Sequence, residues 1–138
     1  MSFVDELRQI QPPDYHKRWV DNLTKCCLYA VKESCYRKQQ LGLHALSGEF
    51  YYSSNDYGTY LIEDTGTYWL INDKVTLSDF ELLKTNFQNG LKEMGFSYPK
   101  VSIRVRNAKT AVGYTWTGKQ KLRETGTQEA CLYIEVEW

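Results

Sequence analysis

The chain has 138 residues, 42% of them hydrophobic, and its 17 basic residues balance its 17 acidic residues. This length is typical of one domain that can bury a core of its own. The zero net charge excludes a general attraction of the whole molecule to nucleic acid or to an anionic membrane. The N-terminal residues show neither a basic region nor an apolar run, and no segment is apolar for long enough to cross a bilayer. We therefore expect neither an export signal nor a membrane span.

The cysteine pattern indicates a reducing compartment. The four cysteines are Cys26, Cys27, Cys35 and Cys131. Three of them fall in one predicted helix, and no C-x-x-C pair occurs. A disulfide framework is therefore not expected, and we predict a cytoplasmic protein.

The N-terminal third is predicted to be helical. Residues 1–11 are predicted to form a short N-terminal arm with one apolar side. Pro12 and Pro13 are expected to end this helical segment. The following segment, 14–45, has no glycine or proline before Gly42 and predicts a helix of ~40 Å. Large residues come first on its apolar stripe and small ones follow, which favours close approach of another helix or of a second copy of the chain.

Residues 49–72 are rich in Tyr and Thr and predict two or three short antiparallel strands joined as β-hairpins. Turn sequences at Asn55–Gly58 and Thr65–Gly66 separate them. A pleated, half-buried sheet surface is the expected environment of such residues.

A second helix is predicted at 78–94. Ser78 is an N-cap candidate with Glu81 three residues later, which is the spacing of a capping box. Leu77 and Leu82 are then placed as a hydrophobic staple. These signals place the start of the helix at Ser78.

The end of this helix is predicted from Gly95, which suits a left-handed C′ position, with Phe96 folding back on Leu91 as in a Schellman motif. Gly90 lies on the apolar side of the same helix. It should allow another element to approach closely.

Three further strands are predicted, at 100–106, 113–117 and 130–138. The basic stretch between the last two is interpreted as a turn region. Arg104 and Arg106 lie on the outward side of the first strand, and Glu135 and Glu137 on the outward side of the last. If these two strands are neighbours, the arginines should pair with these glutamates.

The order of elements predicts a single α+β domain over 1–138. We expect an antiparallel sheet of about four to five short strands, covered on one face by the long N-terminal helix and the second helix.

The sequence contains no signature of catalysis. His16 and His44 are its only histidines, and neither has a partner at metal-ligand spacing. Cys35 and His44 stand about 13 Å apart if both lie in one helix, so they cannot form a nucleophile and base there. We therefore predict that the protein is not an enzyme and that it uses no metal and no cofactor.

One candidate binding surface is the tyrosine-rich hairpin region. Alternation cannot bury all of its aromatic residues on one face, and exposed Tyr and Trp carry much of the binding energy at protein interfaces. Its candidate protein-binding residues are Tyr51, Tyr52, Tyr57, Tyr60, Tyr68 and Trp69.

The second candidate surface follows from a segregation of charge. Seven acidic residues and one lysine occur between Glu49 and Glu81, whereas seven basic residues and no acid occur between Lys100 and Arg123. Basic residues with interleaved aromatics are typical of nucleic-acid or phosphate-ligand binding. The candidates are Arg104, Arg106, Lys109, Tyr114, Trp116, Lys119, Lys121 and Arg123. The alternative is that acidic and basic segments pair within the sheet or between subunits.

The leading hypothesis from these patterns is a small, non-enzymatic interaction module that binds a protein partner or itself through the aromatic sheet face. The alternative is nucleic-acid or phosphate-ligand binding through the basic 100–123 segment. No membrane partner is expected. Small domains without catalytic motifs are frequent in phages and mobile elements, which suggests such an origin.

Overall fold

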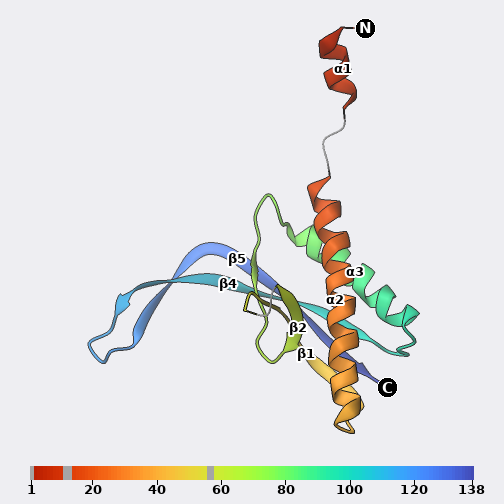
Figure 1. The fold of residues 1–138 in the computed structure, drawn as a ribbon. Coiled ribbons are helices and arrows are strands. Elements are labelled where there is room, and N and C mark those ends of the chain that lie inside the picture. The colour runs from red at the N-terminus through yellow and green to blue at the C-terminus, as the bar shows by residue number, and fades with distance from the viewer. Residues whose placement is uncertain (1, 11–13, 56–57) are drawn as a thin grey trace.

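Two long helices pack against each other and on one face of an antiparallel sheet in the computed structural model (Figure 1). The structure describes residues 2–10, 14–55 and 58–138. Within these ranges the elements are α1 (Phe3–Gln9), α2 (Tyr15–Gln40), β1 (Ala45–Ser53), β2 (Thr59–Glu63), β3 (Trp69–Leu70), α3 (Leu77–Glu93), β4 (Lys100–Tyr114) and β5 (Gln120–Glu137). The predicted single-domain α+β fold is confirmed. None of the helices in the described ranges combines the length and apolar character that crossing a bilayer requires.

β5 is the central strand of the sheet. Along one edge it pairs with β4, and along the other it pairs first with β3 and then with β1. β2 pairs with the free edge of β1. The predicted third strand of the hairpin region is thus not a neighbour of β2. Its two paired residues, Trp69 and Leu70, add to β5 instead.

α2 begins where predicted and ends earlier. The side chain of Asp14 accepts a hydrogen bond from the backbone of Lys17 and caps the N-terminus. The predicted end at residue 45 is wrong, because Gly42 takes a positive φ of 75° and starts a turn. Leu43 N–H then bonds the carbonyl of Lys38, as in a Schellman motif. β1 has already begun at residue 45.

α3 has a different cap from the predicted one. Thr76, not Ser78, is the N-cap, and Asp79 completes the capping box. Leu77 and Leu82 are therefore exposed, at 43% and 48%, and do not form the predicted staple. The C-terminal prediction is confirmed, since Gly95 has a φ of 104° and Phe96 N–H bonds the carbonyl of Leu91.

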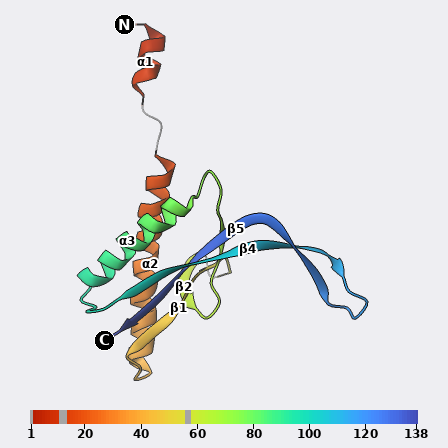
Figure 2. The ribbon, with the colours of Figure 1, turned by 180° about the vertical axis from the view of Figure 1, so that it is seen from behind.

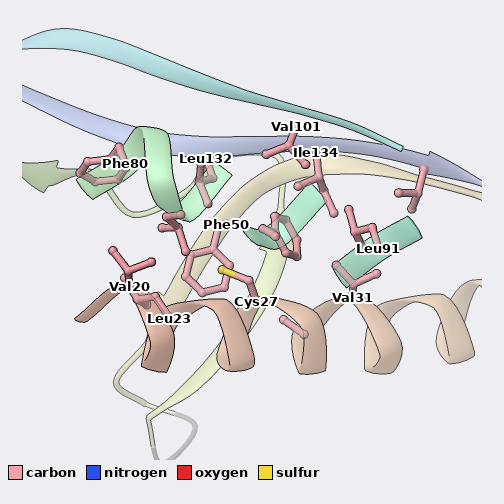
Figure 3. Close-up of a cluster of buried hydrophobic side chains, with 14 of the residues drawn as sticks. Val20, Leu23, Cys27, Val31, Phe50, Phe80, Leu91, Val101, Leu132 and Ile134 are labelled. Carbon is pink, nitrogen blue, oxygen red and sulfur yellow. The ribbon is translucent and has the colours of Figure 1, made fainter. Parts of the chain in front are cut away.

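The core lies between the helices and the sheet (Figure 3). Phe50 of β1 points into its centre, toward Cys27 of α2 and the side chains of β5. The close approach predicted at Gly90 is present, because a Cβ there would lie 2.7 Å from the Leu28 side chain of α2. Two small residues of α2 also pack within the domain, since Cys27 is 0% and Ala30 1% exposed.

The predicted strand at 100–106 and the start of the one predicted at 113–117 belong to one continuous strand, β4, whereas residues 115–117 lie in the turn that follows it. Residues 120–127 of the predicted basic turn region belong to β5. The two strands form a long hairpin. The prediction failed here because the exposed half of the hairpin lacks a buried face. Alternation of apolar and polar residues, the usual signal of a strand, is absent from it.

A charged pair joins the N-terminal ends of the two long helices. His16 Nδ1 lies 2.7 Å from Asp79 Oδ2. The hydrogen bond and the charge of Asp79 raise the pKa of His16 above 6.5. Burial opposes ionisation of Asp79, but hydrogen bonds from Thr76 and His16 outweigh it and lower the pKa of Asp79 from 3.8.

We expect an NMR titration to find the pKa of His16 above 6.5 and to find it lowered toward that value in Asp79→Asn. Because the pKa is raised by folding, the contribution of His16 to stability is complete below pH 6.5 and is lost as the pH rises through the folded-state pKa. His44, which contacts Gln39 instead, is the internal control. An unchanged titration of His16 in Asp79→Asn would contradict this pair.

Candidate functional site

The outer half of the β4–β5 hairpin projects beyond the helices in both views (Figures 1 and 2). We call residues 107–125 the arm. Nearly all of these residues are exposed, with Ala108 buried and Thr115 half-buried. The ladder continues through the arm as far as the pair Tyr114 and Gln120. Backbone pairing, and not a core, therefore holds the arm together.

A bulge marks the base of the arm. Asn107 pairs with Gln128 and Lys109 with Glu124, so residues 125–127 lie opposite Ala108 alone. Gly126 has a φ of 79°, and the hydroxyl of Thr125 bonds the carbonyl of Ala108 at 3.2 Å. Bulges of this kind bend a ribbon and increase its twist.

The arm has two different faces, because residues paired directly across an antiparallel ladder share a face. Arg123 pairs with Thr110 and Lys121 with Gly113, so both cations stand on one face opposite small residues. The other face carries the pair Ala111 and Leu122 and the pair Lys109 and Glu124. The first face is thus basic without an acidic neighbour in the ladder.

A hydrogen-bonded turn forms the tip of the arm. Thr115 N–H donates to the carbonyl of Lys119 at 2.6 Å, and Lys119 N–H donates to the hydroxyl of Thr115 at 3.1 Å. Trp116 lies within this turn and is 98% exposed. Tyr114, just before the turn, is 72% exposed.

The inner half of the hairpin holds two of the predicted basic candidates in internal contacts. The Arg104 guanidinium lies 3.9 Å from the centroid of the Tyr133 ring, and that of Arg106 lies 3.6 Å from the centroid of the Tyr68 ring. Arg106 also bonds Glu129. These two arginines are therefore used in the sheet.

The predicted pairing of these arginines with Glu135 and Glu137 is wrong. In the observed register, Arg104 lies opposite Cys131 and Arg106 opposite Glu129, while Glu135 lies opposite Lys100. The prediction paired the correct two strands but in the wrong register. Alternation shows which side chains of each strand face outward, but the register also depends on where the hairpin turn closes.

A buried carboxylate lies on the face of the sheet away from the helices. Glu49 is 6% exposed and accepts a hydrogen bond from the Tyr68 hydroxyl at 2.6 Å. Arg104 approaches it to 4.0 Å. Burial and the bond to Glu49 raise the pKa of Tyr68 to about 12. Sequence reasoning missed Glu49, although an acid within a strand of aromatic residues was the available signal.

Burial disfavours the thiolate form of three of the four cysteines. Burial and the charge of Glu49 raise the pKa of Cys131 to about 12, and burial raises that of Cys35 to about 11. Burial also raises the pKa of Cys27 well above its ordinary value. These three thiols are protonated at neutral pH. Among the described residues, no three His, Cys, Asp or Glu side chains gather as a metal site would require.

A groove of about 780 Å³ lies where the C-terminal ends of α2 and α3 meet the end of the chain. Cys35, Met94, Phe96 and Trp138 contribute to its lining. The indole N–H of Trp138 donates to the side chain of Gln39 at 2.8 Å. Its lining is largely apolar, and the one thiol in it is protonated.

The predicted aromatic surface is divided between the two faces of the sheet. Tyr60 and Trp69 stack on Phe50 toward the helices, with ring centroids 4.8 and 5.8 Å from that of Phe50. Tyr52 packs beside Tyr60 and is 40% exposed. Tyr51 is half-buried, Tyr68 contacts Glu49, and Tyr57 lies outside the described residues. Protein binding through this set stays a prediction.

No protein-family model matches the chain, and comparisons with curated proteins and with solved structures return no significant match either. The function must therefore be inferred from the geometry and charge of the arm and of the sheet.

Proposed function

We propose that this protein binds nucleic acid through the arm. The observation that supports this most directly is the state of the arm's cations. Lys119, Lys121 and Arg123 are exposed, and in the part of the chain that the structure describes none of them has an acidic partner. Cations that stabilise no internal contact are available to phosphate groups.

The distribution of charge favours the same partner. The arm holds four basic residues and one acid, a net charge of +3, and since the whole chain is neutral the remainder carries −3. A polyanion is therefore attracted to the arm and repelled by the rest of the molecule. This polarity also orients an approaching nucleic acid.

The shape of the arm suits the same ligand. A two-stranded β-ribbon can enter the major groove of a duplex, and a basic groove or ribbon can also follow the backbone of a single strand. The arm is free of the helices along its length (Figure 2). It can therefore contact nucleic acid without moving the core.

The test is a fluorescence-anisotropy titration with labelled single-stranded and duplex oligonucleotides at about 50 mM and about 200 mM salt. If three phosphate contacts form, the affinity for duplex should fall roughly 40-fold over this range, because counterions are released on binding. Binding that does not change with salt, or no binding at low salt, would contradict the proposal.

The variant Lys121→Glu/Arg123→Glu should lose most of this affinity and should reduce the salt slope by about 1.8 on duplex. Its matched control is Lys25→Glu/Lys32→Glu, which makes the same change of charge at exposed positions of α2. The control should bind almost as the unaltered protein does. Equal losses in both variants would mean that net charge, and not the arm, determines binding.

A further inference from the structure

Trp116 differs from the other three tryptophans of the chain. Trp19 and Trp69 pack against the core, and Trp138 is 41% exposed with its indole N–H bonded to Gln39. Trp116 is 98% exposed, and among the described residues it has no ring contact. It therefore contributes almost no burial to folding.

The turn that carries Trp116 is held in one shape. Thr115 and Lys119 are joined by two hydrogen bonds, one donated by the backbone N–H of each residue. In addition, Gly118 N–H donates to the carbonyl of Thr115 at 2.9 Å. Gly118 has a φ of 84°, which the turn requires and which side chains disfavour. The indole is thus presented on an ordered backbone, which reduces the entropy lost when a ligand covers it.

The surroundings of the indole indicate the chemistry of that ligand. Lys119 and Lys121 follow it within a few residues, and no acid occurs between Lys100 and Arg123. A flat aromatic ring beside cations matches a base attached to its phosphate. In a paired duplex the faces of the bases are covered by their neighbours, so only an unpaired base can offer its face to the tip.

We infer that Trp116 stacks on an unpaired base, so that the arm's preferred ligand is single-stranded nucleic acid or a duplex with an unpaired base. This inference rests on the proposed function. Lys121 and Arg123 supply the attraction to the backbone, and Trp116 supplies the preference for unpaired bases.

The experiment compares Trp116→Ala, Trp116→Phe and Lys121→Glu/Arg123→Glu on a single strand, on a matched duplex and on that duplex with one bulged base. Trp116→Ala should weaken single-strand binding roughly 5- to 150-fold, which corresponds to the loss of one base–aromatic stack. Its duplex affinity and its salt slope should stay nearly unchanged. Trp116→Phe should recover much of the loss, because a ring that can stack is kept.

Tryptophan fluorescence gives a second readout. Stacking should quench Trp116 when the single strand or the bulged duplex is added, and the quenching should be absent in Trp116→Phe. Since the turn lies outside the core, circular dichroism should show all three variants folded.

The outcomes separate this inference from the proposed function. If Trp116→Ala binds every ligand as the unaltered protein does while Lys121→Glu/Arg123→Glu loses binding, the stacking inference fails and the proposed function stands. Equal losses on single strand and duplex in Trp116→Ala would also overturn the stacking inference. If the unaltered protein binds none of the three ligands at low salt, the proposed function itself is wrong.

Discussion

Phe50→Ala should destabilise the protein by about 3–5 kcal/mol, the usual cost of removing a buried Phe side chain. Phe50 is 1% exposed at the centre of the core and stacks on Tyr60 and Trp69 (Figure 3). The substitution leaves a cavity and removes both ring contacts. A domain of this kind has a total stability of about 5–15 kcal/mol, so the loss is a large part of it.

Urea denaturation followed by circular dichroism measures this effect. Phe50→Leu should lose less, because most of the volume is kept. Val112→Ala, at a residue of the arm that is 55% exposed, is the control and should change stability by less than about 0.5 kcal/mol. A loss below about 1 kcal/mol in Phe50→Ala would show that Phe50 is not at the centre of the core.

Gly66→Ala is expected to destabilise the protein by roughly 1–3 kcal/mol through overpacking. A Cβ at this position would lie 2.6 Å from the backbone oxygen of Phe50 and 2.7 Å from the Cys131 sulfur. The loop that carries Gly66 must then move away from the sheet. That movement should also separate Tyr68 from Glu49.

Two measurements test this together. Denaturation gives the loss of stability, and a spectrophotometric titration should find the pKa of Tyr68 lowered from about 12 toward 10. The variant Tyr68→Phe lacks the Tyr68 hydroxyl, so the part of the titration that disappears in it belongs to Tyr68. The matched control is Gly90→Ala. Its new Cβ meets the flexible side chain of Leu28, and alanine has a higher helix propensity than glycine.

Gly90→Ala should therefore stay near the stability of the unaltered protein. If Gly66→Ala were equally stable and the pKa of Tyr68 unchanged, the close packing of this loop on the sheet would be contradicted. Neither Gly66 nor Phe50 belongs to the arm, so nucleic-acid binding should survive both substitutions at temperatures where the variants are folded.

The helices were predicted better than the strands. The capping and stop signals of a helix are local, so Asp14 and Gly95 could be recognised directly. At the start of α3 the predicted cap, Ser78, was wrong, and the observed capping box of Thr76 and Asp79 includes a contact from outside the helix. Asp79 is held by His16 of α2, and it caps the helix only when Thr76 is the N-cap.

The candidate site was predicted in part. The segregation of basic residues into the 100–123 segment is visible in the sequence, and so is the interleaving of Tyr114 and Trp116. The sequence does not show which of these basic residues make internal contacts and which are free. Arg104 and Arg106 are used against Tyr133 and Tyr68, and these partners lie far away in the sequence.

By itself, the sequence determined the class of fold, the amphipathic helices and the polarity of charge, because each depends on residue type and local spacing. The tertiary structure alone decided the register of β5, the length of the arm and the exposure of Trp116. These depend on pairing between distant segments and on where the helix layer ends. Lys121 is a candidate from the sequence, but only the structure separates it from Arg104 and Arg106, because among the described residues it has no acidic partner.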